Sequence, residues 1–207
     1  MSNLSYDLGQ YGQPKALEEI FTKNGDEEKF FIEAGAFDGI RLSNTLRLEL
    51  LGQNWTGLLV EPHQEPYRLL RSKDRNAWTL PTCLSRDIYV ETVEFLNPYD
   101  SKCCGVIDDD LSAYKDFPMG SSFEIQCFPL YSVLKAINRT KVDLLGLDIE
   151  GSDLQVLQTI PFDKIDIKVI VLESQFLDAD ELRRFLNSHG YVFYRRVAID
   201  DIFIKVR

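Results

Sequence analysis

Three acidic residues each end an apolar segment with the character of a β-strand, and they are the side chains best suited to chemistry in this sequence. Glu33 ends a segment that starts at Phe30, Glu61 ends WTGLLVE, and Asp148 ends VDLLGLD. In an open α/β sheet the carboxyl ends of parallel strands meet at one edge, where ligands bind. A single acid at a strand end is usually solvated or a helix cap. Three at matched ends predict a shared site for a ligand that carries positive charge.

The first acid stands beside a glycine-containing turn. The run FFIEAGAFDGIRLSNT joins a strand to Gly35, Gly39 and then Ser43, which can cap the next helix. Glycines let the backbone approach a ligand, and a helix N-terminus presents free N–H groups. The spacing E-x-G-x-x-x-G differs from the dinucleotide pattern G-x-G-x-x-G, which weakens the alternative of an NAD-dependent oxidoreductase. It is the form found in methyltransferases that use S-adenosylmethionine (SAM), a cation without phosphate.

The segment LDIEGSD contains the second cluster of candidate residues. In one interpretation it is a strand-to-helix turn where Glu150 complements the helix dipole. In the other, Asp148 faces the transferred methyl group. Methyl transfer to oxygen requires loss of the alcohol proton, and the available bases are Asp148, Glu173, His63 and His189. Asp148 and Glu173 could instead share a Mg²⁺ ion, because hard cations prefer carboxylates.

Strand-like and helix-like segments alternate along the chain, which predicts a mostly parallel sheet covered on both faces. A C-terminal antiparallel hairpin, turning at Asp200-Asp201, makes this an α/β, Rossmann-like fold of the class I methyltransferase type with seven strands. Pro81 puts the third strand at an edge. The expected strands are 30–33, 55–61, 77–84, 142–148, 167–173, 191–196 and 202–206. The expected helices are 14–24, 43–52, 66–72, 130–138, 152–161 and 178–189, those at 43, 152 and 178 capped by Ser43, Ser152 and Asp178.

Residues 91–128 interrupt this alternation. ETVEFL and SSFEIQCF have the pattern of antiparallel strands, and a polar loop with CCG, DDD and PMGSS lies between them. We interpret the region as an inserted β-hairpin whose long tip is typical of functional lids or disorder. Otherwise the chain, residues 1–207, is predicted to form a single domain.

Composition limits the partners that this protein can have. The chain has 207 residues and a formal net charge of −10, with no cluster of basic residues. Nucleic acids and anionic membrane surfaces are therefore disfavoured. No apolar run reaches the roughly 18 residues of a membrane span, and no signal peptide precedes the first helix. We expect a soluble cytoplasmic protein, although N-x-S/T triplets at Asn3, Asn54 and Asn138 leave open a secretory lumen, as part of a longer protein.

The cysteines do not follow a metal-binding pattern. None stands in a C-x-x-C pair, and the chain has two histidines, so no zinc site is expected. Reduced thiols are the favoured state for these cysteines, which are Cys83, Cys103, Cys104 and Cys127.

Four blocks of the sequence resemble the FkbM-type methyltransferases, SAM-dependent enzymes that mostly methylate hydroxyl oxygens. The blocks occur in the family's order and cover roughly residues 7–207. The segments SNTLRLE and QYGQ resemble the eukaryotic Star-like branch, whose members are often membrane-anchored and linked to protein trafficking. A non-catalytic binding or trafficking module is therefore the alternative function. The four blocks are FIEAGAFDGIRLSNT, WTGLLVEPH, CLS and LLGLDIEGSDLQVL.

The resemblance implies roles for individual residues. Asp148 and Glu150 face the reacting centre, with Glu173 and His63 as further catalytic candidates. The acceptor is a small molecule or carbohydrate hydroxyl, and the oligomeric state is not indicated. The residues implied to bind SAM are Glu33, Gly35, Ala36, Asp38, Gly39, Ser43 and Asn44 at the methionine end, Glu61 and Pro62 at the ribose, Cys83, Leu84 and Ser85 at the adenine, and Asp148 beside the transferred methyl group.

Overall fold

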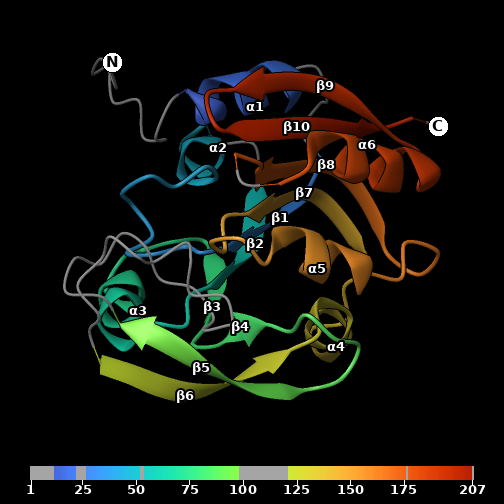
Figure 1. Ribbon diagram of the computed structural model, residues 1–207. Helices are drawn as coiled ribbons and strands as arrows, with labels where there is room; N and C mark the ends of the chain where they lie inside the picture. Colours follow the sequence, from blue (N-terminus) through green and yellow to red (C-terminus); the bar gives the residue numbers. More distant parts are fainter. Residues whose placement is uncertain (1–11, 22–26, 52–53, 98–120, 176, 207) are drawn as a thin grey trace.

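The computed structural model describes residues 12–21, 27–51, 54–97, 121–175 and 177–206 (Figure 1). Seven strands form the central sheet: β1 Lys29–Ala34, β2 Trp55–Val60, β3 Ala77–Leu80, β7 Lys141–Leu147, β8 Asp166–Glu173, β9 Tyr191–Val197 and β10 Asp200–Lys205. A smaller sheet contains β4 Cys83–Leu84, β5 Glu91–Asn97 and β6 Ser121–Phe128. The helices are α1 Gln13–Phe21, α2 Leu46–Leu50, α3 Gln64–Arg71, α4 Leu130–Ala136, α5 Asp153–Gln158 and α6 Ala179–Ser188.

The strand order of the central sheet is β3-β2-β1-β7-β8-β10-β9. The strands from β3 to β8 run parallel, and β10 is antiparallel to both β8 and β9. The chain moves outward from β1 to β3 and then returns to β7 on the other side of β1. The topological switch point therefore lies between β1 and β7, where a doubly wound sheet forms its ligand crevice. This order confirms the predicted Rossmann-like class I methyltransferase fold.

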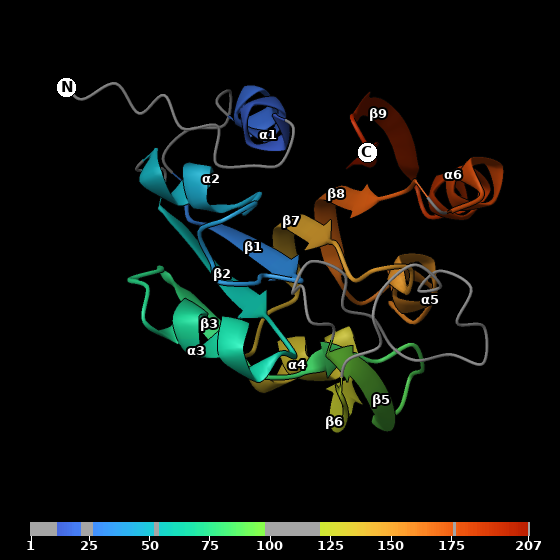
Figure 2. The same cartoon turned by 60° about the vertical axis from the view of Figure 1, so that its left-hand side comes forward.

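Helices cover both faces of the central sheet (Figure 2). All residues of β1 are buried, as expected for a central parallel strand, and alternate side chains enter the two layers: Ile32 on one face and Phe31 on the other. No described helix is long and apolar enough to cross a lipid bilayer. The helix residues that pack on the two faces are Leu134, Leu157 and Leu186 from α4, α5 and α6, and Leu17, Leu48 and Leu70 from α1, α2 and α3.

The third predicted strand is two strands. β3 ends at Leu80, and Pro81, which cannot donate to a ladder, precedes a change of direction. Cys83 and Leu84 then pair with β6 in the smaller sheet. The prediction that 77–84 forms one edge strand is wrong in this second half.

The C-terminal hairpin turns earlier than predicted. β10 begins at Asp200, so the turn lies at 198–199 and not at Asp200-Asp201. Both acids are buried because each has a partner: the Asp200 carboxylate accepts a hydrogen bond from Gln13 Nε2 at 2.7 Å, and Asp201 pairs with Arg196 at 2.6 Å. Local sequence cannot reveal such partners.

Of the three predicted helix caps, the one at Asp178 is confirmed, since its carboxylate caps α6. The N-cap residue of α2 is Thr45 and not Ser43, although the Ser43 hydroxyl accepts a hydrogen bond from the Leu46 N–H. Ser152 makes no side-chain cap at α5. The carboxylate of Asp153, the next residue, instead accepts hydrogen bonds from the backbone at 149 and 151.

A disulfide bond joins Cys83 to Cys127, so the expectation of reduced thiols is wrong for this pair. β4 and β6 run side by side with these two residues directly opposite. Their separation of 44 positions in the sequence conceals this proximity. The pairing of β5 with β6 confirms the inserted hairpin, whereas its polar tip, residues 98–120, lies outside the described residues.

Candidate active site

The close approach of β1 and β7 explains the first glycine of the turn. Gly35 has a φ of +83°, and a Cβ atom at this position would lie 2.0 Å from the Asp148 carbonyl oxygen. The Asp148 N–H donates to the Ala34 carbonyl at 3.1 Å. Because only glycine accommodates both the dihedral angle and the contact, the turn brings Asp148 beside the loop of residues 35–45.

Glu33 organises this loop. Its carboxylate accepts hydrogen bonds from the Asn44 N–H at 2.6 Å, the Ser43 hydroxyl at 2.9 Å and the Thr45 hydroxyl at 2.6 Å. These three donors occupy most of the acceptor positions of a carboxylate. Glu33 therefore ties the end of the loop to β1, and its charge is less available to a ligand than the sequence suggested.

Arg75 holds the same loop and was missed by the sequence analysis. Its guanidinium donates to the Gly39 carbonyl and to Thr45 Oγ1 at 2.8 Å, and its Nε donates to Glu49 at 2.7 Å. The side chain is 1% exposed. The fixed fork of arginine donors suits acceptors that lie at different sites. Its partners are 26 to 36 residues away in sequence, so the surrounding SKDRNAW gives no signal of the role.

Glu61 follows β2 and connects two backbone segments. Its carboxylate accepts hydrogen bonds from the Phe37 and His63 N–H groups, both at 2.8 Å. Burial raises the pKa of Glu61 to about 7, although these two donors act in the opposite direction. Each carboxylate oxygen keeps a further lone pair, which a ligand hydroxyl can use.

His63 belongs to an aromatic wall between the central and smaller sheets. Its ring lies edge-on to Phe95 at 5.6 Å and to Phe123 at 5.2 Å between centroids. Burial lowers the pKa of His63 to about 4, so the imidazole is neutral at pH 7. Its Nε2 is buried without a hydrogen-bond partner in the described part of the chain. A base with so low a pKa is poorly matched to proton abstraction at neutral pH.

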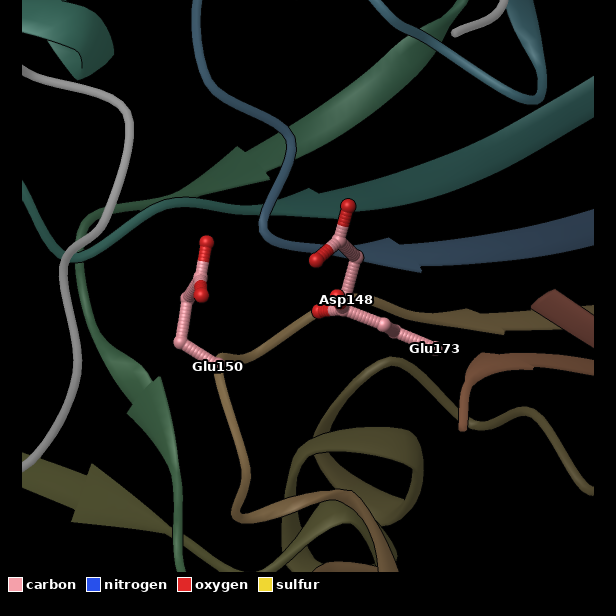
Figure 3. Close-up of side chains that lie close together, drawn as sticks. All are labelled: Asp148, Glu150 and Glu173. Atoms are coloured by element: carbon pink, nitrogen blue, oxygen red, sulfur yellow. The ribbon is translucent and has the colours of Figure 1, made fainter. Parts of the chain in front are cut away.

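Asp148, Glu150 and Glu173 form an acidic cluster at the ends of β7 and β8 (Figure 3). Asp148 is exposed to solvent. The pKa of Asp148 is raised well above its usual range. The main cause is desolvation by the surrounding protein atoms, followed by the negative charges of Glu173 and Glu150. Burial and the charges of Glu173 and Asp153 raise the pKa of Glu150 to about 7. Repulsion in this cluster is relieved by a proton or by a cationic ligand.

The same three carboxylates are the residues that would hold a divalent metal. Their ligand atoms lie within 4.8 Å of one another, and hard cations choose such oxygen donors. A bound metal would supply Lewis-acid polarisation of an acceptor oxygen. The cluster also suits an organic cation, and the reaction proposed below passes through no metal.

Residues 33–193, most of the chain, match the Methyltransferase FkbM domain. The chain belongs to this family. The match confirms the resemblance to FkbM-type methyltransferases and supports SAM-dependent methyl transfer. It spans the Glu33 turn and both later strand-end acids. Comparison with curated proteins finds no match.

Three solved structures resemble the FkbM domain in fold at low sequence identity. A Pyrococcus horikoshii protein proposed to be an RNA methyltransferase is 13% identical, with a TM-score of 0.47 over 97% of this chain and 88% of that chain. A chain of the fibrillarin/Nop5p complex is 13% identical, with a TM-score of 0.49 over 95% and 83%. A TehB-like SAM-dependent methyltransferase from Corynebacterium glutamicum is 11% identical, with a TM-score of 0.44 over 95% and 89%. At these values no substrate assignment transfers.

One pocket of the FkbM domain collects most of the predicted site residues. It lies at the switch point between β1 and β7 and extends over the end of β2 to the smaller sheet. This is the crevice in which such sheets bind ligands. The predicted residues that line it are Glu33, Gly35, Ala36, Ser43, Asn44, Glu61, Pro62, His63, Cys83, Leu84, Asp148 and Glu150.

Five predicted residues do not line this pocket: Asp38, Gly39, Ser85, Glu173 and His189. His189 is the C-cap residue of α6. Asp38 accepts hydrogen bonds from the backbone at 40 and 41, which shapes the loop. The Ser85 hydroxyl donates to the carbonyl at 89 and so holds a turn. Gly39 packs against α3. Glu173 reaches the acidic cluster without forming a wall.

The sequence analysis missed several lining residues, including Phe37, Leu42 and Phe95. Phe37, Leu42 and Glu150 have φ values of 49°, 62° and 54°, a region that costs energy for non-glycine residues and is enriched at functional sites. No residue type at these positions signals such angles. Phe95 comes from the inserted β5, whose position against the central sheet only the structure reveals. The other missed residues are Ala34, Arg41, Val60, Pro66, Gly146, Leu147, Ile149 and Ser152.

Proposed function

We propose that the FkbM domain binds SAM in this pocket and transfers its methyl group to a hydroxyl oxygen of a small molecule or carbohydrate. The observation that carries the proposal is the pair Asp148 and Glu150. Both line the pocket, and neither carboxylate accepts a hydrogen bond from the described residues. Carboxylates without donors in a cleft favour a cationic ligand. When bound, SAM supplies an electrophilic methyl group on a positively charged sulfur.

Other walls of the pocket suit the rest of such a ligand. The free lone pairs of Glu61 can accept hydrogen bonds from both hydroxyl groups of a ribose. An acid at the end of a second strand has this role in nucleotide-binding sheets. Pro62, Cys83 and Leu84 provide an apolar surface beside it for an adenine ring. Asn44 contributes a buried side-chain oxygen without a partner among the described residues, which can accept a hydrogen bond from an ammonium group.

Asp148 is the proposed base. The acceptor oxygen attacks the methyl carbon, a C–O bond forms as the methyl–sulfur bond breaks, and S-adenosylhomocysteine leaves. The hydroxyl proton passes to Asp148, whose raised pKa makes it a stronger base than an ordinary aspartate. The close approach of Gly35 and the hydrogen bond from the Asp148 N–H to the Ala34 carbonyl hold the backbone of this residue in place. Much of the rate then comes from holding the two reactants in line.

Several parts of the assignment stay predictions. The acceptor is expected not to be a nucleic acid, since the pocket walls contain one arginine and no lysine within the described residues. The Star-like branch and a single domain over residues 1–207 are likewise proposals.

Calorimetric titration with SAM, S-adenosylhomocysteine and NADH tests the proposed function. We expect both adenosyl ligands to bind and NADH not to bind. Binding of SAM with no product over a panel of polyols and sugars would favour the non-catalytic binding or trafficking module. Binding of neither adenosyl ligand would contradict the proposal.

A further inference from the structure

Arg41 is the one arginine or lysine among the described residues that line the pocket. Its side chain is exposed, and no ion pair joins it to a described carboxylate. A guanidinium stays charged at all physiological pH values and binds planar anions through paired N–H donors. The guanidinium of Arg41 is therefore available to an anionic group of a ligand, because no carboxylate among the described residues pairs with it.

The loop holds Arg41 in place at both backbone and side chain. The Asp38 carboxylate accepts a hydrogen bond from the Arg41 N–H at 2.8 Å. The guanidinium lies over the Phe37 ring, 5.6 Å from its centroid. Phe37 is in turn fixed by the hydrogen bond from its N–H to Glu61 at 2.8 Å. Phe37 thus connects the two charged groups: its ring contacts Arg41, and its N–H donates to Glu61, the carboxylate proposed to bind the ribose.

Different segments of the chain bring charges of opposite sign to the pocket. Arg41 belongs to the loop after β1, whereas Asp148 and Glu150 follow β7. A ligand that satisfies both needs a carboxylate or another planar anion together with positive groups. The amino-acid end of SAM has this composition, with an α-carboxylate, an ammonium group and a sulfonium.

We propose that Arg41 binds the α-carboxylate of the methionine part of SAM and of S-adenosylhomocysteine. The inference rests on the proposed function, since it names a contact within the same ligand. It makes Arg41 a residue that selects adenosyl ligands bearing an intact amino acid. Asp38 and Phe37 act as positioning residues for it.

The test compares two probes that differ by one group. S-adenosylhomocysteine has the carboxylate, and its decarboxylated form keeps the ammonium group and lacks only the carboxylate. We expect Arg41→Gln to weaken binding of S-adenosylhomocysteine roughly ten- to a hundredfold, the range of a charge-assisted pair. Binding of the decarboxylated probe should change less than about twofold, because its lost group is the one that Arg41 contacts. Arg41→Lys keeps the charge without the fork and should give an intermediate loss.

Arg68→Gln is the matched control, because Arg68 is exposed on α3, pairs with Glu65 and does not line the pocket. It should bind both probes as the wild type does. Equal weakening of both probes by Arg41→Gln would overturn the inference and indicate a structural role. Unchanged S-adenosylhomocysteine affinity with a raised acceptor KM would overturn it in favour of an anionic acceptor. If the wild type binds neither probe, the proposed function itself fails.

Discussion

The backbone of Asp148 is held by a hydrogen bond, and its carboxylate lies close to those of Glu150 and Glu173. Its N–H is held by the Ala34 carbonyl, so Asp148→Asn should leave the main chain in place while it removes the base. We expect methyl transfer to fall about 10²- to 10⁴-fold, measured as release of S-adenosylhomocysteine. Because Glu173 and Glu150 repel the native carboxylate, the melting temperature should not fall. Near-normal turnover would exclude Asp148 from proton transfer.

Glu61 allows a second test at the level of one side chain. Glu61→Ala should weaken SAM binding by about tenfold or more, because the ribose loses charge-assisted hydrogen bonds. The variant also frees the Phe37 and His63 N–H groups, so its melting temperature must be measured alongside the calorimetric affinity. Glu65→Ala, on the exposed face of α3, is the control. Unchanged affinity in Glu61→Ala would refute the ribose role.

The position of an acid at a strand end predicted which acids lie at the site, but it did not predict the contacts that each of them makes. Glu33, Glu61 and Asp148 could be found because each ends a buried apolar run, which sequence reveals. Glu33 accepts hydrogen bonds from three donors that lie 10 to 12 residues away in the sequence. Arg75 donates to the same loop, at Thr45, from 30 residues away. Such contacts depend on the assembled fold and leave no local pattern.

Among the elements, the smaller sheet contributes one wall of the pocket. The disulfide fixes β6 to β4, Cys83 lines the pocket, and β5 carries Phe95 into the same wall. Cys83→Ser combined with Cys127→Ser should lower the free energy of unfolding by about 2–4 kcal/mol. It should also weaken binding of S-adenosylhomocysteine, since the wall loses its covalent anchor.

Denaturant titration and calorimetry, with and without dithiothreitol, measure both effects. The reduced wild type should match the double variant, and dithiothreitol should not change the double variant further. Alkylation followed by mass spectrometry should label Cys83 and Cys127 only after reduction. Labelling of either residue without a reductant would contradict the bond. A disulfide bond of this kind persists in oxidising surroundings.

Element types were predictable where one strong periodicity decides them. The buried apolar runs of β1, β7 and β8 are short enough to favour strands over helices, and their alternation with helices predicts a parallel sheet. The predicted ends of strands were wrong where contacts between distant parts of the chain compete with the local preference of the sequence. After Pro81 the chain leaves the central sheet, and β4 pairs with β6. Asp200 pairs with Glu173 of β8, and its buried carboxylate accepts a hydrogen bond from Gln13.

At the scale of the whole molecule, several acids are buried in the pocket and near it, where their negative charge lowers the stability of the fold. Burial comes first among the causes that raise the pKa values of Glu61, Glu150 and Asp153 to about 7 and of Asp200 to about 6. In an unfolded chain such groups titrate near about 4. The native state therefore binds more protons than the unfolded state between about pH 4 and 7.

The free energy of unfolding of the ligand-free protein should consequently fall as the pH rises from about 5 to 7.5. Each proton that the native state holds in excess contributes at most about 1.4 kcal/mol per pH unit. Denaturant titrations at several pH values measure the slope. A stability that rises over this interval would contradict the charge distribution described here.

Binding of SAM should reverse this loss, because its positive groups lower the pKa values of the acidic cluster and expel protons. SAM affinity should therefore rise between about pH 5.5 and 7, with proton release detected by calorimetry in two buffers of different ionisation enthalpy. S-adenosylhomocysteine, which lacks the sulfonium charge, should give a smaller rise, and Asp148→Asn should reduce the rise for SAM. If SAM affinity is flat or falls over this interval, Asp148 and its neighbours do not face the positive end of the ligand, and the sulfur must be bound elsewhere in the pocket.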